Sequence, residues 1–197
     1  MLIEKDEIKA YQHRVAKITR TRFLAAQDYV AARCCLLNGI ILPGYILAAQ
    51  AVEKELKSII MLVKPESHQL KKYRHDLVRI IDDLNEIYNI NLLIYKSFVE
   101  TLSLVYKSRR YADDKAENSV QYLSNDILAD LDNMFLTFAE FNFLRYNLKY
   151  HNGVLAIMLS EKNHPIKFWA LKENVFFEKN LARFKEEKKA IRRDKTH

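Results

Sequence analysis

The sequence has few residues that interrupt helices. Its 197 residues include only three glycines and three prolines, and these lie in small groups separated by long intervals. Glycine and proline are unfavourable in helix interiors, so the intervals between them favour helix. No Asn-Gly or Asp-Gly pair lies between alternating apolar runs, which is the usual sign of a β-hairpin. The chain is therefore predicted to be all-α.

Cysteines and long apolar runs are also scarce. The two cysteines, Cys34 and Cys35, are adjacent, and neighbouring helical residues point in different directions, so a disulfide between them is not expected. Apolar stretches are too short to span a bilayer, and the N-terminus lacks the apolar region of a signal peptide. These features predict a cytoplasmic protein that does not associate with membranes.

Several motifs that carry chemistry are missing. The sequence has no GxGxxG or GxxxxGK[ST] loop for phosphates, no HExxH zinc motif and no GxSxG nucleophile turn. The six histidines form no i, i+4 pair, and the sequence lacks the two ExxH motifs of a di-metal bundle, since only Glu161 and His164 have that spacing. We therefore expect no metal, no cofactor and no nucleophilic hydrolase site.

Charge is the first feature that points to a partner. The chain has 32 basic and 25 acidic residues, a net charge of +7. A basic balance favours polyanions such as RNA or DNA, although many basic proteins bind neither. Charge by itself leaves the ligand open.

Apolar residues at steps of three and four predict a series of long helices. The stripes are Phe23, Ala26, Val30, Cys34 and Leu37; Tyr45, Ala49, Val52, Leu56, Ile59 and Val63; Leu77, Ile80, Ile81 and Leu84; Ile94, Phe98, Leu102 and Val105; and Ile127, Leu131, Met134, Phe138 and Phe141. The expected helices cover approximately residues 4–37, 43–63, 75–88, 92–108, 124–150 and 170–193, the first with a possible break near residues 19–21. Residues 109–122 are polar and aperiodic, which predicts a loop. Residues 154–160 fit either a strand or a buried turn. Long helices with short connections predict an antiparallel up-and-down bundle of four to five helices with an extra C-terminal helical segment.

The order of several segments is more informative than any one of them. A tyrosine-bearing helix, AAQDYVAARCCLLNG, precedes GYILAAQAVEKELKSIIML; RHDLVRIIDDL follows, and a later helix ends in YKSRRYADD. This arrangement, from Thr21 to Phe141, resembles the HEPN domain family (higher eukaryotes and prokaryotes nucleotide-binding domain). One departure is Ala112, which stands where the family usually has proline after Arg-Tyr. The resemblance suggests a HEPN-like bundle over residues 21–152, between a helical extension over 1–20 and a C-terminal extension over 153–197 that ends in a basic helix.

The resemblance implies a nucleotide- or RNA-binding module that forms a homodimer. Relatives of this kind are accessory or non-catalytic, and they pair with a nucleotidyltransferase or an antitoxin protein in toxin–antitoxin or defence systems. The positions that match the family's segments supply the candidate nucleotide- or RNA-binding residues: Lys54, Lys57, His75, Arg110 and Tyr111. Arg110 and Tyr111 together offer a charge for phosphate and a ring for a base. Each of these residues also has a purely structural interpretation, as an exposed helix residue or a ring that closes the core.

Two other functions remain open. Many relatives are metal-independent RNases with an R-x(4–6)-H motif, and the segment RYNLKYH, from Arg145 to His151, is a literal match to that pattern. Along a straight helix these two residues would be offset by about 9 Å and about 120°, so they would converge only if the helix breaks or a second subunit contributes. The remaining alternative is a protein interaction module with no nucleic-acid ligand. In that case the polar stripe of Gln50, Glu53, Lys54 and Lys57 would dock a partner protein.

The end of the chain is strongly charged. From Phe184 to His197 it carries six basic and three acidic residues, and few apolar ones. We expect this segment to be a solvated helix whose removal after Arg183 leaves the fold intact. Its charge would either keep the protein soluble or act as an arm that strengthens RNA binding without reading sequence.

Overall fold

The computed structural model describes residues 5–63, 70–88, 90–111, 127–146, 153–160 and 165–193, with side chains over 9–63, 70–87, 90–107, 127–142, 153–160 and 165–186. Within these ranges the chain is helical and contains no strand, which confirms the all-α bundle. None of the helices described combines the length and apolar character needed to cross a membrane.

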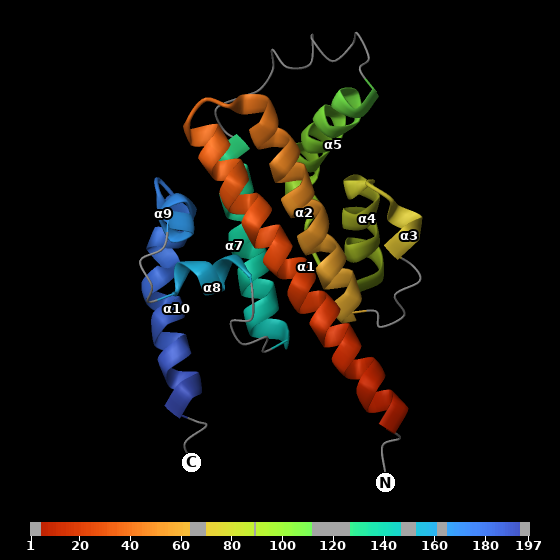
Figure 1. Cartoon of the computed structure of the whole chain (residues 1–197), viewed down its shortest axis with the longest axis vertical. Helices are drawn as coiled ribbons and strands as arrows, with labels where there is room; N and C mark the ends of the chain where they lie inside the picture. Colours follow the sequence, from red (N-terminus) through yellow and green to blue (C-terminus); the bar gives the residue numbers. More distant parts are fainter. Residues whose placement is uncertain are drawn as a thin grey trace.

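Two long antiparallel helices, α1 (Lys5–Leu37) and α2 (Ile41–Val63), form the centre of the molecule (Figure 1). Helix α1 is continuous through residues 19–21, where a break was possible, and passes through the expected boundary at residue 20. It ends at Leu37, and Gly39 in the turn that follows has a positive φ of 72°, which suits a residue without a side chain. A Cβ on Gly44 would lie 2.7 Å from the Leu36 side chain, so this glycine lets the two helices approach closely after the turn.

The remaining helices lie on either side of this pair. On one side are α3 (Leu70–Tyr73), α4 (Leu77–Tyr88), the 3-10 turn η2 (Leu93–Tyr95) and α5 (Lys96–Tyr111). On the other, α7 (Ile127–Tyr146) is followed by α8 (Val154–Met158), α9 (Pro165–Leu171) and α10 (Val175–Arg193). The view in Figure 1 places α3 and α4 opposite α9 and α10, with α1 and α2 between them.

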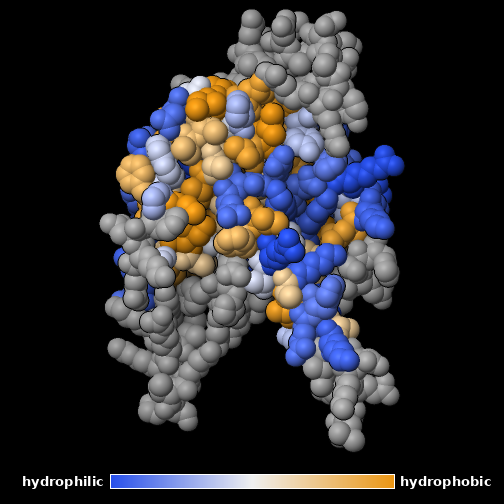
Figure 2. All heavy atoms as spheres, viewed as in Figure 1, coloured by the Kyte–Doolittle hydropathy of each residue, from blue (hydrophilic) through white to orange (hydrophobic). Residues whose placement is uncertain are grey.

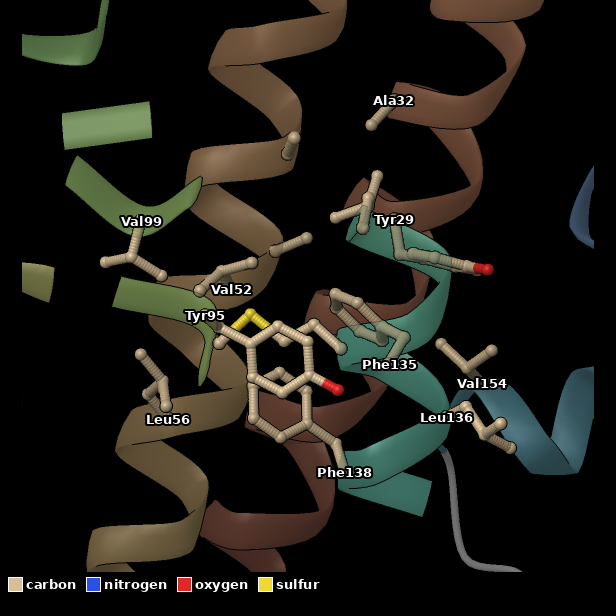
Figure 3. Packing of buried hydrophobic residues seen from close by; sticks show 14 of the residues in the cluster. Tyr29, Ala32, Val52, Leu56, Tyr95, Val99, Phe135, Leu136, Phe138 and Val154 are labelled. Atoms are coloured by element: carbon tan, nitrogen blue, oxygen red, sulfur yellow. The ribbon is translucent and has the colours of Figure 1, made fainter. Parts of the chain in front are cut away.

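The core is formed where α1, α2, α5 and α7 meet (Figure 3). The rings of Tyr29 and Phe135 stack with centroids 4.3 Å apart, and Phe138 meets Phe135 edge-on at 5.4 Å. Val52, Leu56 and most other residues of the predicted α2 stripe are fully buried. Burial of each large side chain contributes roughly 1.5–3 kcal/mol, which makes this core the main source of stability.

Several expected details were wrong. Residues 154–158 form helix α8 rather than a strand or turn, and the predicted last helix is two helices, α9 and α10. Helix α5 continues to Tyr111, so the first residues of the expected 109–122 loop are helical. Phe23 and Ile94 were expected in apolar stripes, but they are 43% and 71% exposed. A periodic pattern identifies a helix face, yet only the neighbouring helices decide how wide a face is covered.

Candidate functional site

Helix α2 presents two predicted site residues to different surroundings. Lys57 lies one turn after Glu53, and its Nζ donates to Glu53 Oε1 at 2.5 Å. Lys54 is rotated away by about 100° from Glu53, as neighbouring helical residues are. Its Nζ forms an ion pair with Asp28 on α1. The structure therefore places Lys57 beside α3 and α4 and Lys54 beside α1.

Lys57 and His75 are brought together by Glu53, which the sequence analysis placed in the polar stripe of this helix but not among the candidate binding residues. Nδ1 of His75 lies 2.9 Å from Oε2 and 3.1 Å from Oε1 of Glu53. Lys57 Nζ also donates to the carbonyl oxygen of Arg74 at 2.6 Å. The carboxylate is thus shared by an ammonium group and an imidazole, and His75 itself remains partly exposed.

The backbone between α3 and α4 aims His75 at Glu53. Arg74 has a positive φ of 45°, which is uncommon for a residue with a side chain and turns the chain sharply. Asp76 then caps α4, because its Oδ1 accepts from the backbone N–H of Arg79 at 3.2 Å. The sequence predicted a helix that starts at His75, but α4 begins at Leu77, so His75 lies in the turn before it.

A groove of about 420 Å³ lies beside His75, between the α3–α4 turn and α5. Its described lining has one carboxylate, that of Asp76, and four cationic side chains: Lys72, Arg74, Arg79 and Lys107. Two rings, Tyr73 and Tyr106, complete the lining, and the Tyr106 ring lies 5.5 Å from that of His75, tilted by 41°. Figure 2 shows hydrophilic side chains gathered over α3 and α4. A cleft of this size, with cations and rings, suits a phosphorylated organic ligand.

Not all of this charge is available. Lys72 Nζ and the Tyr73 hydroxyl both donate to Asp83 Oδ2 at 2.6 Å. Burial acts to raise the pKa of Asp83, but hydrogen bonds from Lys72 and Tyr73 outweigh burial and lower that pKa from its usual value. Within the described side chains, by contrast, neither the Arg74 guanidinium nor the Lys107 ammonium has an ion-pair partner. These two cations are available to meet an anion.

The other predicted residues lie beyond what can be placed. Arg110 and Tyr111 belong to the last turn of α5, but their side chains are outside the described set, as is that of Arg145. His151 lies outside the described residues altogether. The proposed RNase pair therefore remains a sequence prediction. The described part of the chain contains no cluster of three His, Cys, Asp or Glu residues suited to a metal ion.

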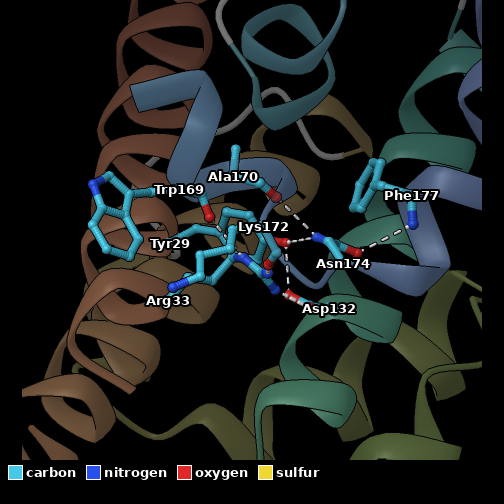
Figure 4. A network of polar contacts seen from close by, with 8 residues as sticks. All are labelled: Tyr29, Arg33, Asp132, Trp169, Ala170, Lys172, Asn174 and Phe177. Carbon is cyan, nitrogen blue, oxygen red and sulfur yellow. Dashed lines mark hydrogen bonds and ion pairs between the residues drawn. The ribbon is translucent and has the colours of Figure 1, made fainter. Parts of the chain in front are cut away.

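A buried network around Arg33 was not anticipated from the sequence (Figure 4). The Arg33 side chain is fully buried, forms an ion pair with Asp132 on α7, and donates to the carbonyl oxygens of Trp169 and Lys172. Asp132 also accepts from the Tyr29 hydroxyl at 2.7 Å, and Asn174 Nδ2 donates to the same hydroxyl oxygen at 2.8 Å. This network fastens the α9–α10 segment to α1 and α7.

A second buried pair lies near the start of α8. Arg22 Nε donates to Glu55 Oε1 at 3.2 Å, and Asn142 Nδ2 donates to the same oxygen at 2.9 Å. Burial raises the pKa of Glu55 despite the opposing charge of Arg22. The adjoining cavity is only about 20 Å³, room for a single water molecule. This cluster is structural, so the groove beside His75 is the candidate site.

No family model, no curated protein and no solved structure matches this chain.

Proposed function

We propose that this chain is a HEPN-type module that binds a nucleotide or RNA in the groove between the α3–α4 turn and α5, without cleaving it. The observation that carries the proposal is the groove itself, whose described lining combines four cations and one carboxylate with two tyrosine rings. Cations bind phosphate oxygens, and rings stack on bases of any identity. Of the predicted binding residues, His75 lines this groove, and Lys57 shares the carboxylate that holds His75.

The sequence resemblance supports the same ligand from a separate direction. The segments that resemble the HEPN family include the α2 surface with Lys57 and the RHDL turn with Arg74 and His75. These segments are far apart in sequence, yet the Glu53 carboxylate joins them. At the family's usual catalytic position, four to six residues after Arg110, the chain has no histidine, which favours binding over cleavage.

The first test measures RNA and nucleotide affinity with a charge reversal in the groove. Arg74→Glu and Lys107→Glu, alone and together, are compared with Lys17→Glu, which changes an exposed residue of α1 outside the groove. Binding to fluorescent single-stranded RNA is followed over a salt series. The affinity of the double variant should fall at least about tenfold. The slope of log affinity against log salt concentration should also become shallower by roughly one to two, because each lost phosphate contact lowers it by about one. Lys17→Glu should bind nearly as the parent does.

Two results would overturn the proposal. One is the absence of RNA or nucleotide binding at low salt, where phosphate contacts are strongest. The other is an equal loss in Lys17→Glu, which would show that only overall charge matters. Incubation of RNA with the protein in chelator tests the RNase alternative, because cleavage that His151→Ala abolishes would establish the Arg145–His151 site instead.

The association states proposed from the resemblance need separate measurements. We propose a homodimer, to be examined by sedimentation at several concentrations. We also propose an accessory role beside a nucleotidyltransferase or an antitoxin protein. Co-purification of a stoichiometric partner without nucleic acid would favour the interaction-module alternative.

A further inference from the structure

The hydrogen bond between Glu53 and His75 fixes what the imidazole can offer to the groove. A carboxylate oxygen only accepts hydrogen bonds, so Nδ1 of His75, 2.9 Å away, must carry the proton. In a neutral imidazole the second nitrogen, Nε2, then has a lone pair and no proton. Among the described side chains Nε2 has no hydrogen-bond partner, and His75 lines the groove.

A lone pair repels an anionic oxygen, whereas an N–H attracts it. A phosphate that enters the groove beside neutral His75 therefore meets an unfavourable contact, which a proton on Nε2 converts into a charge-assisted hydrogen bond. The Glu53 carboxylate lies against Nδ1, and Lys57 shares that carboxylate, so an added charge on the ring would face both groups.

The charged groups around the groove make the proton uptake depend on the ligand. From α2, His75 faces Glu53 and Lys57. From the α3–α4 segment the groove is lined by Lys72, Tyr73, Arg74, Asp76 and Arg79, and from α5 by Tyr106 and Lys107. A dianionic phosphate that enters the groove would place its negative charge among these cations and beside the imidazole.

We propose that His75, positioned by Glu53, takes up a proton when the groove binds a phosphate, and that it thereby selects a phosphomonoester over a phosphodiester. This inference rests on the proposed nucleotide or RNA binding and names the part of the ligand that is recognised. A phosphomonoester carries close to two negative charges and three terminal oxygens, whereas a diester carries one charge and two such oxygens. Arg74, Lys107 and protonated His75 together match the monoester. The ligand is thus a free 5′-nucleotide or the 5′-phosphorylated end of an RNA, which share this group.

The test uses calorimetry of the full chain with AMP at pH 8, in two buffers of different ionisation enthalpy. The monoester is already a dianion at this pH, since its second pKa is about 6, so any proton taken up comes to the protein. We expect AMP binding to be accompanied by a net uptake of protons by the protein. His75→Gln should still bind AMP, more weakly, with uptake close to zero. Glu53→Gln should reduce the uptake, and Lys17→Glu should leave it unchanged.

Selectivity is measured with matched probes. AMP should bind at least about tenfold tighter than the dinucleoside monophosphate ApA, and His75→Gln should narrow that ratio. A 5′-phosphorylated oligoadenylate is compared with its 5′-hydroxyl form: preference for the phosphorylated end identifies an RNA terminus, and preference for AMP over both identifies a free nucleotide. Adenosine, which lacks phosphate, should bind weakly or not at all.

A measurement on the unaltered protein guards against a variant that fails to fold. The His75 ring protons are followed by NMR over pH with and without AMP, with His75→Gln used only to assign the signal. Saturation with AMP should move the titration midpoint of His75 to higher pH. Three results would overturn this inference and leave the proposed function intact. These are AMP binding without proton uptake, proton uptake that His75→Gln does not change, and a His75 titration midpoint that AMP does not move. If neither AMP nor RNA binds at low salt, both fail.

Discussion

The buried network around Arg33 and the groove beside His75 both combine carboxylates with cationic side chains, but in opposite ways. In the first, a guanidinium, a carboxylate, a hydroxyl and an amide are all buried, and their hydrogen bonds are made within the chain. In the second, a carboxylate, an ammonium and an imidazole lie at the surface beside cations that have no ion-pair partner among the described residues. Burial and the saturation of hydrogen bonds, rather than residue type, therefore distinguish a structural network from a binding site.

The largest difference is expected between the removal of Asp132 and the removal of Asp83, the carboxylate that holds Lys72 and Tyr73 of the groove. Asp132→Ala leaves the buried Arg33 charge unpaired, which should cost about 3–5 kcal/mol of the free energy of unfolding. Asp83→Ala removes a partly exposed partner of Lys72 and should cost no more than about 1 kcal/mol. Urea denaturation followed by circular dichroism measures both. Equal losses would contradict the distinction between the two regions.

The C-terminal segment gives the next largest effect. Phe184 is 1% exposed, so Phe184→Ala should cost about 3–5 kcal/mol, whereas Phe168→Ala, at a residue 59% exposed, should cost less than about 0.5 kcal/mol. Thermal melts of both variants check this.

The expectation that residues after Arg183 are dispensable therefore needs correction, because such a truncation removes a buried ring. A chain that ends at Glu186 should fold normally, and unfolding of that chain would show that the later residues also pack.

The turn at Arg74 allows stability and binding to be separated. Arg74→Gly relieves a backbone conformation that disfavours a side chain, so it should raise the free energy of unfolding by about 0.5–1 kcal/mol while it weakens AMP binding. Glu173 is the matched control: it has a positive φ of 58° and lies outside the groove. Glu173→Gly should stabilise the protein to a similar extent and leave AMP affinity unchanged. A loss of affinity in both variants would mean that the assay reports stability.

The smallest expected effect is an opposite response to pH. The pKa of Asp83 is lowered, so its contribution to stability is present above its unfolded value, about 3.9, and is lost as pH falls through the folded pKa. Burial raises the pKa of Asp132 against the influence of Arg33, so folding favours its protonated form and stability decreases as pH rises above about 4.

Stability relative to the parent should therefore respond oppositely in two asparagine variants. The free energy of unfolding of Asp83→Asn should be lower than that of the parent at neutral pH by no more than about 1 kcal/mol, and the two values should converge as pH falls below about 4. The free energy of unfolding of Asp132→Asn should increase relative to that of the parent as pH rises above about 4. Urea midpoints at pH 3, 5 and 7 check both slopes. Slopes of the same sign would show that the two carboxylates do not differ as described.

Much of the helical pattern could be predicted from sequence because helix faces repeat along the chain. The stripe of Leu77, Ile80, Ile81 and Leu84 is buried as expected, and the same holds for most of the α2 stripe. Residues 154–158 were not predicted as helix because five residues are too few to show a period. Ile94 was misplaced because it belongs to the 3-10 turn η2, outside the regular period of α5.

The candidate site was predicted only in part. Lys57 and His75 were identified from the resemblance, but the contact between His75 and Glu53 joins residues 22 positions apart. Lys54 has the same residue type and nearly the same position as Lys57, yet it pairs with Asp28 of α1 instead. Which side of α2 faces which neighbour depends on how the helices pack, and local spacing contains no such information.

By itself, the sequence determined that this protein is an all-α bundle, because apolar periodicity and the scarcity of glycine and proline act locally along the chain. It also determined which residues carry charge. Only the tertiary structure decided which charges became a buried clasp and which remained available in a groove. Arg33 is buried and saturated because α7 and α9 surround it, whereas Arg74 and Lys107 meet across a cleft that α3, α4 and α5 leave open. The energy of a charge depends on the dielectric and the partners around it, and both are set by residues distant in sequence.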